Sequence, residues 1–195
     1  MGIVGTYRLV LIILACANFS IRPCLASQVS AAERQEALKV IRFLEKIEFE
    51  EGIKRPGPLK RENFTESELN SYIAYRIETE KEDVMKELTL KLFEKNRVEG
   101  KMFIDLSGQK LPPVLKPQMN VYFEGVLTVQ NGQARFDFQK LFVEGQQVPV
   151  VILDLIIFVA ANLGKSEPGS INDWYELPPG IKDLRTDLGR ILVYY

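Results

Sequence analysis

The first part of the chain alternates between apolar and polar positions with the period of an α-helix. Apolar residues behind a capping-box pattern at Ser30–Glu33 predict an amphipathic helix from Ala31 to Phe49. The following segment, Glu50–Asn63, contains two glycines and two prolines, so we expect a loop there. Four cations in this loop belong either to a solvated linker or to a surface that meets anionic lipid headgroups or glycans: Lys54, Arg55, Lys60 and Arg61.

A second helix is predicted to begin at Glu66. Thr65 is placed as its N-cap and Glu68 as its third helical residue, and together they form a capping box. Phe64 and Leu69 flank this cap at the spacing of a hydrophobic staple. The start of this helix is therefore the best-defined local feature of the chain.

The period of the pattern then changes from that of a helix to the two-residue period of strands. Alternating apolar residues predict one hairpin over Leu88–Leu106 and a second over Val121–Phe138. The second hairpin turns at Asn131-Gly132, a pair that suits the type I′ turn between antiparallel strands. A last strand is predicted within Ile181–Tyr195.

Between the second hairpin and the last strand lies the most apolar segment of the second half of the chain. We expect a helix over Val148–Leu163, ended by Gly164, and a helix that is apolar almost all round must be covered by a sheet, another helix or an apolar ligand. Asp154 interrupts it, and this acid either faces solvent or is paired or functional. In the polar loop that follows, Trp174 and Tyr175 either pack on the domain or contact a lipid or glycan.

The N-terminus, residues 1–26, is predicted to be a cleaved secretory signal peptide. The apolar run Leu9–Phe19 follows a basic residue and precedes small residues at the positions that a signal peptidase recognises before the cut at Ala26. The run is too short for a membrane anchor, while lipidation at Cys16 is a second alternative. The expected location is therefore secreted or periplasmic, and the cut removes both cysteines, Cys16 and Cys24.

Composition excludes several classes of function. The chain of 195 residues has 25 Lys and Arg against 26 Asp and Glu, so it lacks the basic excess of nucleic-acid binders. It has no histidine, which excludes imidazole-based triads and His-ligated zinc. No glycine-rich phosphate loop or nucleophile elbow is present either. We therefore expect no enzyme activity, catalytic residue, metal or cofactor; a hydrolase that uses carboxylates alone, with Asp154, is the least favoured hypothesis.

The order of elements predicts an α+β fold, in which a curved antiparallel sheet of two long hairpins plus a last strand is wrapped on long helices. FTESELN at Phe64–Asn70, the paired strands, the apolar helix from Val148 and LPPGI at Leu177–Ile181 resemble small secreted bacterial members of the tubular lipid-binding (TULIP-like) superfamily. The chain is then expected to have three parts: the signal peptide 1–26, an N-terminal helix with a basic Pro/Gly loop at 27–63, and a TULIP-like lipid-binding domain at 64–195.

This resemblance implies an apolar tunnel between a twisted sheet and a long helix, which holds the acyl chains of a lipid. Apolar and aromatic side chains line pockets of this kind, and the same side chains also suit an ordinary packed core. The sequence leaves these two alternatives open for each candidate lipid-binding residue: Met102, Ile104, Phe123, Leu127, Phe136, Phe138, Ile152, Ile156 and Val159.

The leading hypothesis is an exported, non-enzymatic protein of the cell envelope that binds lipid or another hydrophobic ligand. Its expected partners are lipid, envelope proteins and the membrane surface, and nucleic acid is excluded. The alternative is a secreted protein–protein interaction or scaffold domain with an ordinary packed core. These hypotheses differ in whether the apolar interior is loaded with a ligand.

Overall fold

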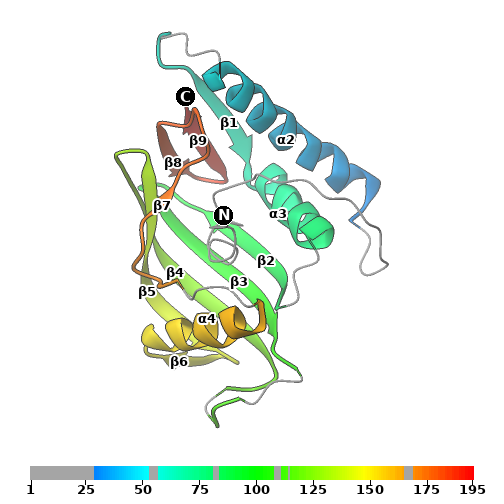
Figure 1. Cartoon of the computed structure of the whole chain (residues 1–195), viewed down its shortest axis with the longest axis vertical. Coiled ribbons are helices and arrows are strands. Elements are labelled where there is room, and N and C mark those ends of the chain that lie inside the picture. Colours follow the sequence, from blue (N-terminus) through cyan, green and yellow to red (C-terminus); the bar gives the residue numbers. More distant parts are fainter. Residues whose placement is uncertain (1–28, 53–56, 81–83, 108–110, 114, 165–168) are drawn as a thin grey trace.

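The computed structural model describes residues 29–52, 57–80, 84–107, 111–113, 115–164 and 169–195. The predicted signal peptide, Lys54 and Arg55 lie outside these ranges. Within them the protein has an α+β fold with a curved antiparallel half-barrel sheet and three helices (Figure 1). The predicted α+β class and the curved antiparallel sheet are therefore confirmed.

The half-barrel is built from strands that follow one another along the chain. Its order is β2 (Met85–Leu92), β3 (Arg97–Asp105), β4 (Gln118–Gln130), β5 (Gln133–Val143) and β6 (Gln146–Val148), and β7 (Tyr175–Glu176) pairs with β5. The predicted turn at Asn131-Gly132 joins β4 to β5, with both residues at positive φ. Short local connections thus produce most of this sheet.

One face of the half-barrel is concave and apolar, because successive side chains of a strand point to opposite faces. Two glycines on this face make room for aromatic rings: a Cβ on Gly100 would overlap the ring of Phe123, and one on Gly125 the ring of Phe136. A β-bulge between Glu124 and Gly125 adds local bending. The concave face carries most of the buried strand residues: Leu88, Leu90, Met102, Ile104, Val121, Phe123, Leu127, Phe136 and Leu141.

A second, smaller sheet corrects two sequence predictions. It has the order β1 (Arg61–Thr65), β9 (Arg190–Tyr194) and β8 (Asp183–Asp187). The predicted loop up to Asn63 is therefore wrong at its end, where β1 begins. The predicted single last strand is also wrong, because Gly189 at positive φ reverses the chain and Asp187 pairs with Arg190 across the turn. Strands β8 and β9 therefore belong to the sheet of β1 and not to the half-barrel.

Two helices form one layer beside the small sheet. Helix α2 (Ala31–Gly52) packs against α3 (Glu66–Glu80), and α2 continues three residues beyond its predicted end. Both predicted capping boxes are confirmed, by reciprocal hydrogen bonds between Ser30 and Glu33 and between Thr65 and Glu68. The backbone amide of Glu68 lies 3.2 Å from Thr65 Oγ1, and that of Thr65 lies 2.9 Å from Glu68 Oε2.

The third helix, α4 (Val151–Gly164), begins three residues later than predicted. Val148 is the last residue of β6 instead, and the carbonyls of Pro149 and Val150 accept the first hydrogen bonds of the helix. Gly164 is the last helical residue rather than the residue after it. None of the helices in the described part of the chain is long and apolar enough to cross a membrane.

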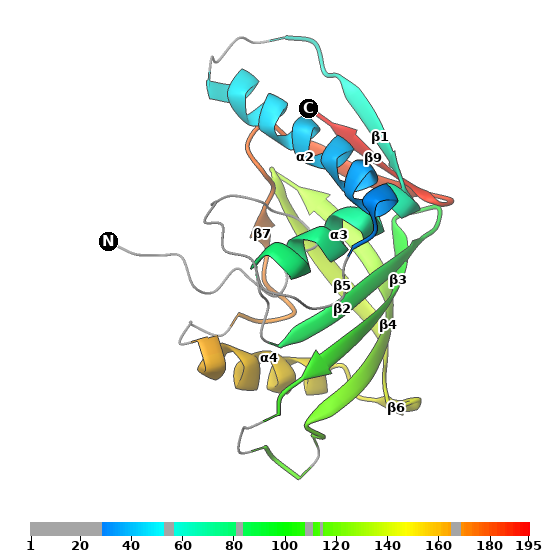
Figure 2. The same ribbon diagram turned by 90° about the vertical axis from the view of Figure 1, so that its right-hand side faces the viewer.

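All three helices lie on the same side of the half-barrel (Figure 2). Helix α3 runs beside β2 near one end of the strands, and α4 lies across the other end, close to β6. The concave apolar face is therefore enclosed by helices at its two ends, with the aromatic residues of β4 and β5 between them.

Candidate functional site

Three phenylalanines form the centre of the concave face. The ring centroids of Phe123 and Phe136 are 5.5 Å apart, those of Phe123 and Phe138 are also 5.5 Å apart, and those of Phe136 and Phe138 are 4.6 Å apart. All three pairs meet edge to face, the arrangement that aromatic quadrupoles favour. The described strands thus place an apolar, polarisable cluster at the middle of the half-barrel.

Six of the nine predicted lipid-binding residues belong to the buried apolar core, and the other three pack against it. Five strand residues of the set are buried, and Leu127 lies directly opposite Phe136 on the neighbouring strand. From α4, Ile156 is fully buried, whereas Ile152 and Val159 are only partly buried. Phe138 is also only partly buried.

Incomplete burial of apolar residues is found where α4 meets the edge of the half-barrel, as it is on α2 and α3. Besides Phe138, the partly buried apolar residues that pack on the core in this region are Val143, Val148, Val150, Ile152, Leu155 and Val159. Leu141 of β5, which pairs with Val148, is fully buried. Apolar side chains therefore remain accessible to solvent along the α4 side of the concave face, although the interior behind them is closed.

Asp154, the one charged residue of α4, is held by the segment that follows the helix. Its Oδ1 accepts a hydrogen bond of 2.9 Å from the backbone amide of Ile171 and one of 3.2 Å from the hydroxyl of Ser170. This segment continues into β7, which pairs with β5. Asp154 therefore ties α4 to the half-barrel, an arrangement that explains an acid in this helix without catalysis.

Tyr175 reinforces this connection. Its phenol donates a hydrogen bond of 2.8 Å to the carbonyl of Ser170, and the side chain is buried. Burial, together with the negative charges of Asp173 and Asp154, raises the pKa of Tyr175 to about 12. Beside it, the guanidinium of Arg135 stacks 4.8 Å from the ring centre of Trp174, which supports the packing interpretation of that tryptophan.

The solvent side of α4 is apolar as well. Val151 is 63% exposed and Phe158 52% exposed, and both lie on the same face of the helix as Leu155. An α-helix with apolar residues on both faces is unusual at a protein surface. This helix presents its buried face to the half-barrel and leaves the other face uncovered by described residues.

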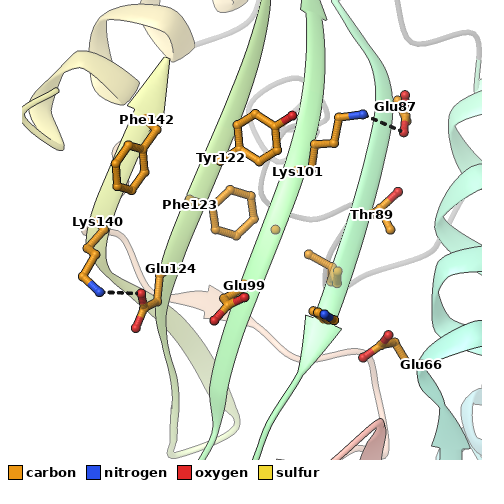
Figure 3. A pocket seen from close by; sticks show the side chains of 13 residues that line it. Glu66, Glu87, Thr89, Glu99, Lys101, Tyr122, Phe123, Glu124, Lys140 and Phe142 are labelled. Atoms are coloured by element: carbon orange, nitrogen blue, oxygen red, sulfur yellow. Dashed lines mark hydrogen bonds and ion pairs between the residues drawn. The ribbon is translucent and has the colours of Figure 1, made fainter. Parts of the chain in front are cut away.

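The opposite, outer face of the half-barrel contains a groove that the sequence analysis did not predict. Its volume is about 760 Å³, and it crosses β2 to β5 (Figure 3). Tyr122 and Phe142 lie directly opposite each other on β4 and β5 and form its aromatic part. The other lining residues are mainly polar: Glu66, Glu87, Thr89, Leu90, Lys91, Glu99, Gly100, Lys101, Phe123, Glu124 and Lys140.

Charged side chains in this groove are partly neutralised by one another. Lys140 Nζ lies 2.8 Å from Glu124 Oε2, and this lysine lowers the pKa of Glu124. Lys101 Nζ lies 3.8 Å from Glu87 Oε1. Glu99, by contrast, makes no hydrogen bond or ion pair within the described part of the chain, and it lies directly opposite Glu124 in the β3–β4 register.

The sequence analysis did not predict this groove, although two aromatic residues in the strand pattern indicated part of it. Tyr122 and Phe142 occupy polar-face positions of strands whose other face is apolar, and large aromatic residues there are unexpected. The register that makes them neighbours involves a bulge, which a period of two does not predict. Among the described residues, no group of three or more acidic or other ligating side chains is arranged to hold a metal ion.

Comparisons with known proteins add no assignment. No family model matches the chain. No curated protein and no solved structure matches it significantly either. The function must therefore be argued from the geometry described above.

Proposed function

We propose that this protein is an exported, non-enzymatic protein of the cell envelope that binds lipid or another hydrophobic ligand. The observation that carries the proposal is the placement of an almost wholly apolar helix, α4, across one end of a concave apolar face that has an aromatic centre. Hydrophobic ligands are held by walls of this composition, with few polar groups. In this proposal the half-barrel with its two long hairpins and helices is a tubular lipid-binding fold.

The partly buried apolar residues around α4 support an entrance at this position. The interior of an ordinary core is closely packed and leaves few voids. Here Phe138 of β5 and Ile152 and Val159 of α4 retain solvent contact, whereas Phe123 and Ile156 behind them are buried. An acyl chain that enters beside α4 would cover these accessible side chains first and then reach the phenylalanine cluster.

The hydrogen bonds of Asp154 give α4 a defined closed position. A helix that lies over an entrance must stay in place without a ligand and move when one enters. Two hydrogen bonds to Asp154 and the two-residue strand β7 hold the segment after α4, and these contacts are few enough to break locally. Asp154 therefore acts as a latch in this proposal and not as a general acid.

Native mass spectrometry of the exported protein, purified without detergent, tests this proposal. We expect excess mass that organic extraction resolves into acyl-containing species. Phe138→Glu places a charge on the apolar wall and should reduce loading at least tenfold, because burying an unpaired carboxylate is costly. Phe49→Glu is the matched control, since Phe49 is 72% exposed at the end of α2 and should load normally.

Exposure of Val151 and Phe158 favours one alternative, a secreted domain that binds another envelope protein through the outer side of α4. This alternative predicts an interior that stays empty after incubation with phospholipid. It also predicts a protein partner whose binding is lost in Phe158→Ala. Recovery of the protein in such an apo state would overturn the lipid-binding proposal.

A further inference from the structure

The outer groove of the half-barrel opens on the other face of the strands from the proposed ligand site, and only Leu90, Gly100 and Phe123 of its lining face the concave side. Tyr122 and Lys101, for example, point away from the concave face, where their neighbours Phe123 and Met102 are buried. We infer that this groove is a binding site for a neutral saccharide chain. The inference is independent of the proposed function.

The register of the strands arranges the groove in two parallel rows. One row runs from β2 to β5 through Thr89, Lys101, Tyr122 and Phe142. The second row, two residues away along each strand, runs through Lys91, Glu99, Glu124 and Lys140. The first row, which contains both aromatic side chains and is called the aromatic row below, therefore lies beside a wholly charged row, as Figure 3 shows for the labelled side chains.

The aromatic row suits the apolar faces of sugar rings. Pyranose rings present C–H groups on their faces, and these groups pack well against aromatic side chains. Tyr122 is 43% exposed, and Phe142 lies opposite it on the neighbouring strand, where cross-strand Cβ atoms are about 4.5–5.5 Å apart. This spacing places two rings side by side, so that consecutive sugar units can each meet one aromatic side chain.

The charged row suits the hydroxyl groups at the edges of the same rings. Glu99 faces Glu124 across β3 and β4, and like charges placed directly opposite are destabilising in a sheet. Lys140 neutralises Glu124, but Glu99 retains its full capacity to accept hydrogen bonds within the described residues. Hydroxyl donors from a ligand would satisfy this carboxylate.

Charge balance selects a neutral ligand over charged polymers. The groove is lined by four glutamates and three lysines: Glu66, Glu87, Glu99, Glu124, Lys91, Lys101 and Lys140. A polyanion would need a basic excess, as phosphate binders have, and a polycation would need an acidic excess. The volume of about 760 Å³ lies within the range of small-molecule sites and accommodates a short oligosaccharide.

Saturation-transfer NMR and calorimetry with soluble tetrasaccharides test the inference. Chitotetraose, cellotetraose and maltotetraose serve as the probes, with the purified wild-type protein. We expect at least one of them to bind, and we expect Tyr122→Ala and Phe142→Ala each to weaken binding about tenfold through loss of a stacking surface. Glu99→Gln should weaken it severalfold, because a neutral amide is a poorer acceptor than a carboxylate.

Phe158→Ala is the matched control, since Phe158 is an exposed aromatic residue on α4, on the other side of the sheet. It should leave tetrasaccharide binding unchanged, and circular dichroism should show that all variants are folded. The inference is overturned if none of the three probes binds at millimolar concentration. Binding that survives the double variant Tyr122→Ala/Phe142→Ala, or a change of oligomeric state in that variant by ultracentrifugation, would also overturn it.

Discussion

The side-chain amide of Asn70 on α3 pairs with the backbone of Leu90 on β2 as a neighbouring strand would. Asn70 Nδ2 donates a hydrogen bond of 2.9 Å to the carbonyl of Leu90, and the amide of Leu90 donates one of 2.8 Å to Asn70 Oδ1. One turn earlier on α3, Glu66 Oε2 accepts a hydrogen bond of 2.7 Å from the amide of Leu92. Helix α3 therefore caps the free edge of the half-barrel, which would otherwise invite pairing with another chain.

Replacing Asn70 with alanine should destabilise the protein by about 1–3 kcal/mol, because two backbone groups of Leu90 then lose their partners. Urea unfolding measures this difference. Asn172→Ala is the control, because the side chain of Asn172 is exposed and only its backbone amide makes a hydrogen bond. Equal stability of the two variants would contradict the role assigned to Asn70.

Gly100 is expected to tolerate no side chain. A Cβ at this position would overlap the ring of Phe123, so Gly100→Ala should cost about 1–3 kcal/mol and displace the aromatic cluster. Thermal unfolding gives the stability, and native mass spectrometry shows whether ligand loading falls as well. Gly57→Ala, where a Cβ meets no atom within 4 Å, should change stability by less than about 0.5 kcal/mol.

Asp154→Ala should loosen the segment after α4 without unfolding the protein. The amide of Ile171 and the hydroxyl of Ser170 lose their shared acceptor, so hydrogen exchange over residues 170–176 should accelerate about tenfold or more. Mass spectrometry of the exchanged peptides measures this. In contrast, peptides from α2 should exchange at wild-type rates, and a uniform acceleration would argue for global destabilisation instead of a latch.

The contact between Lys39 on α2 and Glu68 on α3 predicts a dependence of stability on acid pH. Burial raises the pKa of Glu68, but hydrogen bonds from Lys39, 2.7 Å away, and from Thr65 outweigh it, and the pKa lies below its ordinary value of 4.5. Because the folded-state pKa is lowered, this stabilisation is present above pH 4.5 and is lost as the pH falls through the folded-state pKa.

Glu68→Gln should therefore lose less stability than wild type when the pH is lowered from 7 to 3. Chemical unfolding at each pH provides the comparison. Glu48→Gln is the control on the exposed side of α2, where Glu48 makes no ion pair with the described residues, and its pH profile should follow the wild type. Identical profiles for Glu68→Gln and wild type would contradict the prediction.

The raised pKa of Tyr175 predicts that the protein loses stability when the pH rises, whereas Glu68 predicts a loss when the pH falls. Its pKa is raised to about 12, so the neutral phenol contributes its full stabilisation below pH 10, and this is lost as the pH rises from 10 through 12. Tyr175→Phe should remove this alkaline phase in unfolding experiments and should cost about 0.5–1.5 kcal/mol at neutral pH through the lost hydrogen bond to Ser170. Tyr122→Phe, at an exposed position, should keep the alkaline phase.

Local chemistry allowed much of the fold to be predicted from the sequence. The capping boxes at Ser30 and Thr65, the Asn131-Gly132 turn and the alternation in β2 to β5 each depend on residues within a few positions of one another. For the same reason, the apolar concave residues could be selected from their period before their neighbours were known. Six of the nine candidate residues lie in the buried core, and Phe138, Ile152 and Val159 pack against it.

Tertiary structure decided the features that depend on distant partners. Thr186 Oγ1 donates a hydrogen bond of 2.6 Å to the carbonyl of Phe93, and this contact helps to place the small sheet against the β2–β3 turn. No local sequence pattern predicts it. The partners of Asp154 and Asn70, and the register that sets Tyr122 beside Phe142, depend equally on where separate segments meet. By itself, the sequence determined the three helices, the strands β2 to β5 and the apolar faces of these elements, because they follow from short-range sterics and periodicity. It did not reveal β1 or the turn between β8 and β9, which form the small sheet. Only the packed chain decided which polar groups meet, because hydrogen bonds and strand register are specific to the final arrangement.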